Sequence, residues 1–156
     1  MKDINFLATQ FRSAIDKALS KGEFENDFSF NHFPRGCCGD ASVLLSQYLL
    51  DNAIMTYYVC GNYYFDDITA NAQSHAWIWT EDKTIIDITG DQFKNNSIFL
   101  NYAVSVYIGQ KDEFHKLFKV ENRRDVHENL GLDALSSICL PRLRELYQKI
   151  KKYIMI

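Results

Sequence analysis

The sequence feature that most constrains the fold is a run of apolar residues with helical spacing between positions 38 and 50. These residues occupy more than one face of a helix; they are Cys38, Ala41, Val43, Leu44, Leu45, Tyr48 and Leu49. A helix that is apolar over much of its circumference is enclosed by other elements. We therefore expect a central, mostly buried helix over residues 38–50, with the rest of the chain packed around it.

Further helices are expected near both ends of the chain. Residues 4–19 carry apolar side chains at intervals of three and four, which is the spacing of a helix with one buried face. A short helix is expected over residues 132–139, and Pro141 should end it because proline breaks a helix interior. The same helical spacing returns between Leu143 and Ile154, which predicts a last amphipathic helix there.

Four stretches between these helices have the composition of β-strands. They are rich in β-branched and aromatic residues and cover residues 57–60, 74–80, 84–89 and 103–108. Residues 121–131, in contrast, are charged and typical of a loop. The chain of 156 residues shows no internal repeat and no linker, so we expect a single domain over residues 1–156.

Charge and composition exclude several classes of protein. The net charge of −3 argues against a general nucleic-acid binder. The chain has neither a signal-peptide pattern nor an apolar run of ~18 residues, so no membrane partner is expected and a soluble cytoplasmic protein is predicted. Its four cysteines show no C-x-x-C spacing, which argues against a zinc site; neither a metal nor another cofactor is expected.

The residues that lead into the central helix place a thiol at its N-terminus. Pro34, Gly36 and Gly39 surround the adjacent Cys37 and Cys38. A cysteine in the first turn lies at the positive end of the helix dipole, beside backbone N–H groups that have no intrahelical acceptor. Because this environment favours the thiolate, it predicts a reactive cysteine.

Two neighbouring strands supply a base and an acid for such a thiol. With a hairpin centred on Glu81, His75 lies directly opposite Asp87, and both side chains share one face of the sheet. Directly opposite side chains have Cβ atoms about 4.5–5.5 Å apart, which allows an imidazole to bond a carboxylate. A slip of one residue would move Asp87 to the other face. Asp91, in the turn that follows, is an alternative acid.

Cys38, His75 and Asp87 together offer a nucleophile, a base and an orienting acid. The backbone N–H of Cys38 would help to bind an oxyanion, and Asn31 is the polar candidate for a second donor. Trp77 lies on the same face as His75 and is a candidate substrate contact, although a core position is the commoner role for such a residue.

Each candidate also has a purely structural interpretation. A cysteine on an apolar helix is often a small buried hydrophobe, and this remains the expectation for Cys37, Cys60 and Cys139. His75 would then be a hydrogen-bonded core residue beside Asp87. The remaining histidines are expected at the surface or in loops; they are His32, His115 and His127.

Three segments resemble the transglutaminase-like branch of the papain-like cysteine peptidase superfamily. Gly36-Cys37-Cys38-Gly39-Asp40-Ala41-Ser42 resembles its G-x-C-G-D helix start, His75-Ala76-Trp77-Ile78 its H-A-W strand, and Ile85-Ile86-Asp87-Ile88-Thr89 the strand that ends in a catalytic aspartate. The match covers residues 33–93. It favours Cys38 as the nucleophile. Many members of the family have an alanine four residues after the cysteine; counted from Cys38 this position is Ser42, and counted from Cys37 it is Ala41.

The resemblance implies an α+β fold in which the nucleophile-bearing helix packs on an antiparallel β-sheet, flanked by the N- and C-terminal helices. It implies a thiol hydrolase of the cysteine peptidase or amidase kind, which cleaves a peptide or side-chain amide of a peptide or protein substrate through a thioester. The alternatives are an acyl or amine transferase or glutamine deamidase of the transglutaminase type, and a non-catalytic binding module. The sequence leaves the substrate and the oligomeric state open.

Overall fold

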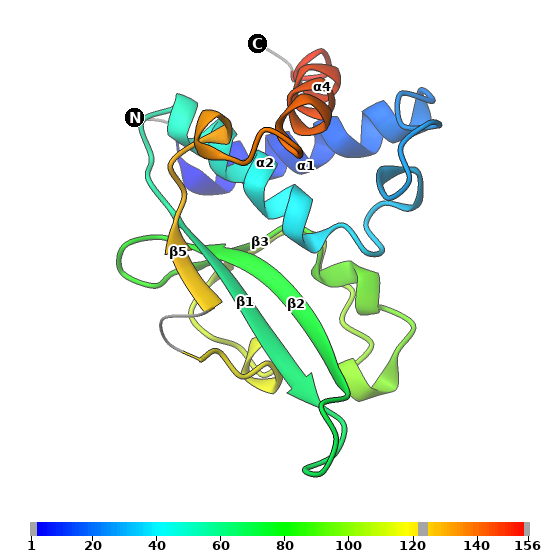
Figure 1. Ribbon diagram of the computed structural model, residues 1–156, viewed down its shortest axis with the longest axis vertical. Helices are drawn as coiled ribbons and strands as arrows, with labels where there is room; N and C mark the ends of the chain where they lie inside the picture. Colours follow the sequence, from blue (N-terminus) through cyan, green and yellow to red (C-terminus); the bar gives the residue numbers. More distant parts are fainter. Residues whose placement is uncertain (1–2, 122–124, 155–156) are drawn as a thin grey trace.

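The computed structural model describes residues 3–121 and 125–154. In this part of the chain, three α-helices gather on one side of a five-stranded antiparallel sheet, so the expected α+β class is confirmed (Figure 1). The helices are α1 (Ile4–Ser20), α2 (Cys38–Asp51) and α4 (Leu140–Lys151). The strands are β1 (Tyr57–Tyr64), β2 (Ala72–Trp79), β3 (Ile85–Asp87), β4 (Tyr107–Gly109) and β5 (Val126–Glu128).

The sheet has the order β4-β3-β2-β1-β5, and short 3-10 helices occupy several loops between the helices and strands. These are η1 (Phe30–His32), η2 (Gly90–Phe93), η3 (Ser97–Phe99), η4 (His115–Leu117) and η5 (Leu132–Ala134). Among the described residues, no helix has the length and apolar character needed to cross a membrane.

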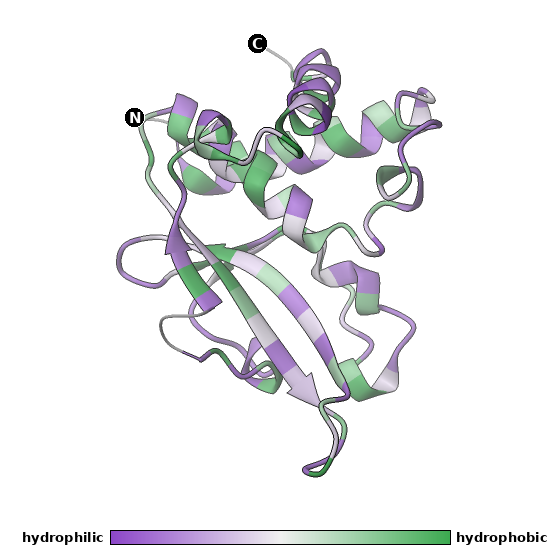
Figure 2. Ribbon diagram, viewed as in Figure 1, coloured by the Kyte–Doolittle hydropathy of each residue, from purple (hydrophilic) through white to green (hydrophobic). Residues whose placement is uncertain are grey.

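The α2 helix is central, as its composition predicts. It packs on β1 and β2 and also contacts α1 and α4. Figure 2 shows hydrophobic and hydrophilic bands alternating along α1, as expected for a helix with one buried face. The buried side chains of the three helices form a helix-side core with Ile78 of β2 and Ile86 of β3.

The opposite face of the sheet carries a second, aromatic core. Trp77 and Ile85 are the chain neighbours of Ile78 and Ile86, and successive strand residues point to opposite faces. This loop-side core, which lies under the connections between β3 and β5, consists of Val59, Trp77, Ile85, Phe93, Phe99, Phe114 and Phe118. The sheet is therefore buried on both faces.

The register of the β2–β3 hairpin differs from the predicted one by two residues. Trp79 pairs with Ile85 and Ile78 with Ile86, so Asp87 is level with Trp77 rather than with His75. The turn at residues 81–83 is closed by the Thr80 N–H bond to the Thr84 carbonyl, which centres the hairpin on Asp82 instead of Glu81. A shift by two residues keeps every side chain on its predicted face.

Four features of the helices and strands also differ from expectation. The first strand extends to Tyr64, and the strand expected over residues 103–108 begins only at Tyr107. The charged segment 121–131 contributes the edge strand β5, which pairs with only three residues of β1. Pro141 lies in the first turn of α4 instead of ending a helix, because a first-turn N–H needs no intrahelical acceptor.

Two arginines connect helices to loops near Cys38 and Asp87. Arg12 binds the loop that follows β3, and Arg142 binds the loop that precedes α2 and the first turn of α2. Arg12 of α1 donates two hydrogen bonds to Asp91 of η2 (2.9 and 2.8 Å) and one to the Ile88 carbonyl (2.7 Å). Arg142 of α4 binds Asp27 at 2.8 and 2.9 Å and Asp40 of α2 at 2.7 Å. The loop before Cys38 and the loop after Asp87 are thus held from two separate helices.

Replacing Arg12 with methionine should lower the free energy of unfolding by about 3–5 kcal/mol, because removing one partner of a buried ion pair leaves the other charge uncompensated. Urea unfolding followed by circular dichroism would measure the change. Lys17→Met, on the exposed part of the same helix, is the matched control and should change it by less than about 0.5 kcal/mol. Equal unfolding midpoints for the two variants would contradict the importance of the Arg12 contacts.

Candidate active site

Cys38 is the first residue of α2, and Cys37 immediately precedes the helix. Among the described backbone hydrogen bonds, the N–H of Cys38 has no acceptor, as expected for a first-turn N–H. The side chain of Cys37 points into the protein, where it is 1% exposed and donates to the carbonyls of Ser29 and Arg35. Cys38 keeps partial exposure.

The two adjacent thiols have opposite acid–base properties. Burial raises the pKa of the Cys37 thiol to about 12. Burial would also raise the pKa of Cys38, but hydrogen bonding and charge attraction from His75, with a further hydrogen bond from the N–H of Ala76, outweigh it and lower the pKa. The structure therefore favours Cys38 as the nucleophilic thiol, as the resemblance does.

The position of the sulfur follows from the shape of the sheet. β3 ends at Asp87, and its pairing with β2 reaches only as far as Ile78. Among the described residues, the earlier part of β2 does not pair with β3, and α2 packs against β2 (Figure 1). The backbone of Ala76 and the ring of His75 both help to lower the pKa of the Cys38 thiol, so the thiol lies beside this part of β2.

His75 and Asp87 form the predicted pair, although by a diagonal contact. The Nε2 atom of His75 lies 2.7 Å from Oδ2 of Asp87, and both side chains are buried. Diagonal neighbours on one face of an antiparallel pair remain within reach of a long side chain. Burial alone would lower the pKa of His75, but Asp87 and Cys38 raise it to about 10.

The orientation of the His75 ring suits proton transfer from the thiol. Because Nε2 bonds Asp87, the nitrogen that remains for Cys38 is Nδ1. The ring is packed among aromatic side chains of the loop-side core, with Phe93 at 5.2 Å and Phe118 at 5.4 Å between centroids. This packing fixes the imidazole in one position.

Asp87 accepts three hydrogen bonds in an environment where it is only 2% exposed. Besides His75, the Nε2 atom of His115 lies 2.7 Å from the same Oδ2 atom, and the N–H of Thr89 lies 3.0 Å from Oδ1. Burial would raise the pKa of this carboxyl, but the two histidines hold it well below its usual range.

His115, expected at the surface or in a loop, lies in a connection of the sheet but not at the surface. It belongs to η4 and is fully buried beside Asp87. The flanking Phe114 and Phe118 are large apolar residues on both sides of a histidine, and this is the one local signal of burial in the sequence. His32 and His127 are exposed, as expected.

Gln92 of η2 is a second polar residue at the site that the sequence patterns did not indicate. Its Nε2 atom lies 3.5 Å from Nδ1 of His75 and donates to the Thr89 carbonyl at 3.0 Å. Its Oε1 atom accepts from the N–H of Gly36 at 3.4 Å. Gln92 therefore joins the loop before Cys38 to the base.

The other residues predicted for the site have different positions. Asn31 is exposed in η1 and lines a surface hollow with the C-terminal end of α1, and no described contact joins it to Cys38. Trp77 is 1% exposed in the loop-side core, which agrees with the structural interpretation. Asp91 binds Arg12 instead of a histidine.

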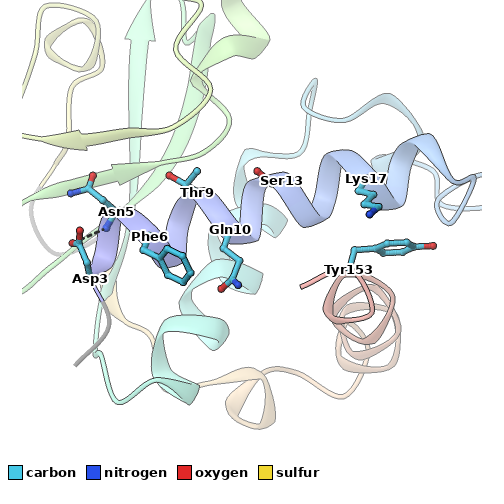
Figure 3. Close-up of a pocket in the computed structure, with 8 residues that line it drawn as sticks. All are labelled: Asp3, Asn5, Phe6, Thr9, Gln10, Ser13, Lys17 and Tyr153. Atoms are coloured by element: carbon cyan, nitrogen blue, oxygen red, sulfur yellow. Dashed lines mark hydrogen bonds between the residues drawn. The ribbon is translucent and has the colours of Figure 1, made fainter. Parts of the chain in front are cut away.

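A hollow of about 800 Å³ lies on α1 near Tyr153, but it contains no thiol or imidazole (Figure 3). Its lining includes Phe6 and Lys17. None of these residues belongs to the cluster around Cys38, so we place the candidate active site at the edge of β2.

One group of described residues has ligand atoms close enough together to suggest a metal site. It consists of His75, Asp87 and His115, whose ligand atoms all lie within 4.8 Å of one another. Both ring nitrogens, however, lie 2.7 Å from one and the same carboxylate oxygen. This is the length of a charge-assisted hydrogen bond, and a zinc site requires ligands arranged tetrahedrally around the ion. We describe the cluster as a hydrogen-bonded network.

Comparison of the chain with protein-family models, with curated proteins and with solved structures gave no match.

At neutral pH, iodoacetamide should modify Cys38 faster than any other thiol, because the thiolate is the reactive form and only this thiol has both a lowered pKa and exposure. Mass spectrometry of the cysteine-containing peptides measures the rates. Cys37→Ala should keep the fast reaction and Cys38→Ala should lose it. Persistence of the fast reaction in Cys38→Ala would exclude Cys38 as the activated thiol.

Proposed function

We propose that this protein is a thiol hydrolase that cleaves a peptide or side-chain amide through a thioester on Cys38. The observation that carries the proposal is the position of His75 between an acid and a thiol. Its Nε2 atom bonds Asp87, and its ring lowers the pKa of the Cys38 thiol. The order of cysteine, histidine and aspartate, and the α2 helix packed on the sheet, support a papain-like, transglutaminase-like fold for the chain.

The proposed reaction begins with the thiolate of Cys38 attacking the carbonyl carbon of the amide. The resulting oxyanion would be bound by the N–H of Cys38, which has no acceptor among the described residues, and by the side-chain N–H of Gln92. His75 then gives its proton to the leaving amine, and the thioester forms. Water, deprotonated by His75, attacks the thioester and releases the acid, which restores the thiol.

Asp87 orients His75 throughout this cycle. Its bond to Nε2 keeps that nitrogen protonated and directs Nδ1 toward the thiol. The N–H of Thr89 and the ring of His115 fix the carboxylate in turn. Asp87 is thus an orienting acid and takes no proton itself.

An acyl or amine transferase, including a deamidase, uses the same three residues and differs in the group that attacks the thioester. The binding-module alternative predicts a thiol and an imidazole that point apart, or a Cys38 thiol with an ordinary pKa, and it predicts no turnover. The experiment must therefore distinguish water from an amine as the acceptor.

Two assays of the purified protein test the proposal. One measures hydrolysis of fluorogenic peptide amides, and the other measures incorporation of a dansylated amine into glutamine-containing casein. A hydrolase should release free acid from the amides and incorporate no amine, and Cys38→Ala should abolish turnover. The rate should fall near pH 10 as His75 loses its proton. Amine incorporation would establish the transferase, and equal turnover by Cys38→Ala would exclude both enzymes.

Replacing Gln92 with alanine should lower kcat about 10²-fold, since one oxyanion donor is lost. Alkylation of Cys38 should remain fast in this variant, because the thiolate is still formed. Gln73→Ala, on β2 but bonded only to the neighbouring Ser74 carbonyl, is the control and should turn over normally. An unchanged kcat for Gln92→Ala would remove Gln92 from the proposed oxyanion site.

A further inference from the structure

His115 has both ring nitrogens bonded to carboxylates although it is fully buried. Its Nε2 atom lies 2.7 Å from Asp87 Oδ2, and its Nδ1 atom lies 2.6 Å from Asp112 Oδ1. An ionised carboxylate can only accept hydrogen bonds, and a neutral imidazole has a single N–H. Two such contacts are satisfied together when the ring carries a proton on each nitrogen.

We propose that His115, held by Asp112, is a doubly protonated imidazolium that keeps Asp87 ionised and in place for His75. His115 is then a positioning residue, since it acts on the reaction through Asp87. This inference rests on the proposed function for its role in catalysis, but the protonation of His115 can be tested without any turnover.

Asp112 is a strong anionic partner because it already accepts several bonds. The backbone N–H of His115 donates to Oδ1 at 2.8 Å, and the hydroxyl of Tyr102 donates to Oδ2 at 2.9 Å. Protonating Asp112 would remove acceptors that these groups use. The shared proton is therefore expected on the imidazole and not on the carboxyl.

The remaining neighbours of His115 include residues from two strands of the sheet, β4 and β2. Tyr107 of β4 stacks on the ring at 5.3 Å, and Trp77 of β2 meets it edge-on at 5.0 Å. His75 of β2 lies 6.2 Å away between ring centroids. The ionisable groups that face His115 are thus two carboxylates, the hydroxyls of two tyrosines, and the catalytic imidazole.

A positively charged His115 would stabilise Asp87 during the step in which His75 loses its proton. When His75 passes its proton to the leaving amine, Asp87 loses its cationic partner inside the protein, where an unpaired charge is costly. His115 retains its proton and remains as the counter-charge. Its positive charge also repels a proton on His75, which favours proton delivery.

Imidazole ¹⁵N spectra of the intact protein test the protonation directly. At pH 7.5 the His115 ring should show two protonated nitrogens. A ring of His115 with one unprotonated nitrogen would overturn the proposal. A stoichiometric metal ion in the purified protein, displacing the ring protons, would overturn it equally.

His115→Gln tests the effect on the reacting pair, since glutamine retains an amide donor for Asp87 without the charge. Loss of a nearby positive charge raises the pKa of the Cys38 thiol, so the pH dependence of its alkylation should move about one pH unit to higher pH. Lys116→Gln removes a charge from the exposed surface of the same element and should cause no such shift.

The outcomes separate this inference from the proposed function. A shift of the Cys38 alkylation profile in a folded His115→Gln variant supports the role of His115 even if no amide substrate is turned over. An unchanged profile, with turnover of wild type intact, would leave the enzyme proposal standing and exclude His115 as a charged positioning residue. If His115→Gln does not fold, the ¹⁵N spectrum of the wild type still decides the protonation.

Discussion

The ionised carboxylate of Asp87 is the constraint on which the site depends. A carboxylate taken out of water is stable only when donors replace its hydration, and Asp87 receives donors from His75, His115 and Thr89. These donors come from β2, from η4 and from the residues after β3, so the sheet and its connections must be assembled together. Rows of aromatic side chains around the two imidazoles exclude water and make each of these bonds stronger.

The sequence predicts the helices and the faces of the strands well, because both follow from the periodicity of apolar residues. Side-chain alternation places His75 and Asp87 on one face, although the turn at residues 81–83 makes their contact diagonal. His115 and Gln92 could not be found in this way. Each lies in a short 3-10 helix whose position is set by packing between distant segments, and such helices have no periodic signal.

The sequence does not predict the edge strand β5, for a related reason. Its sequence, Val126-His127-Glu128, lies in a charged segment, and it forms a strand because β1 offers a free edge there. Strand formation at an edge depends on the partner more than on local propensity. Asn31 lies close to Cys38 in the sequence, but the fold places it at the surface in η1, whereas Gln92 of η2 lies beside His75.

Arg142 bears on the order in which the molecule is completed. This residue lies 115 positions after Asp27 and 102 after Asp40, yet it binds both, on either side of the turn that presents Cys38. During synthesis the cysteine, the histidine and the aspartate all leave the ribosome before α4 does. The thiol is therefore aligned only after α4 has been made, and a chain without α4 would carry the reactive residues without the Arg142 contacts that hold the turn before Cys38.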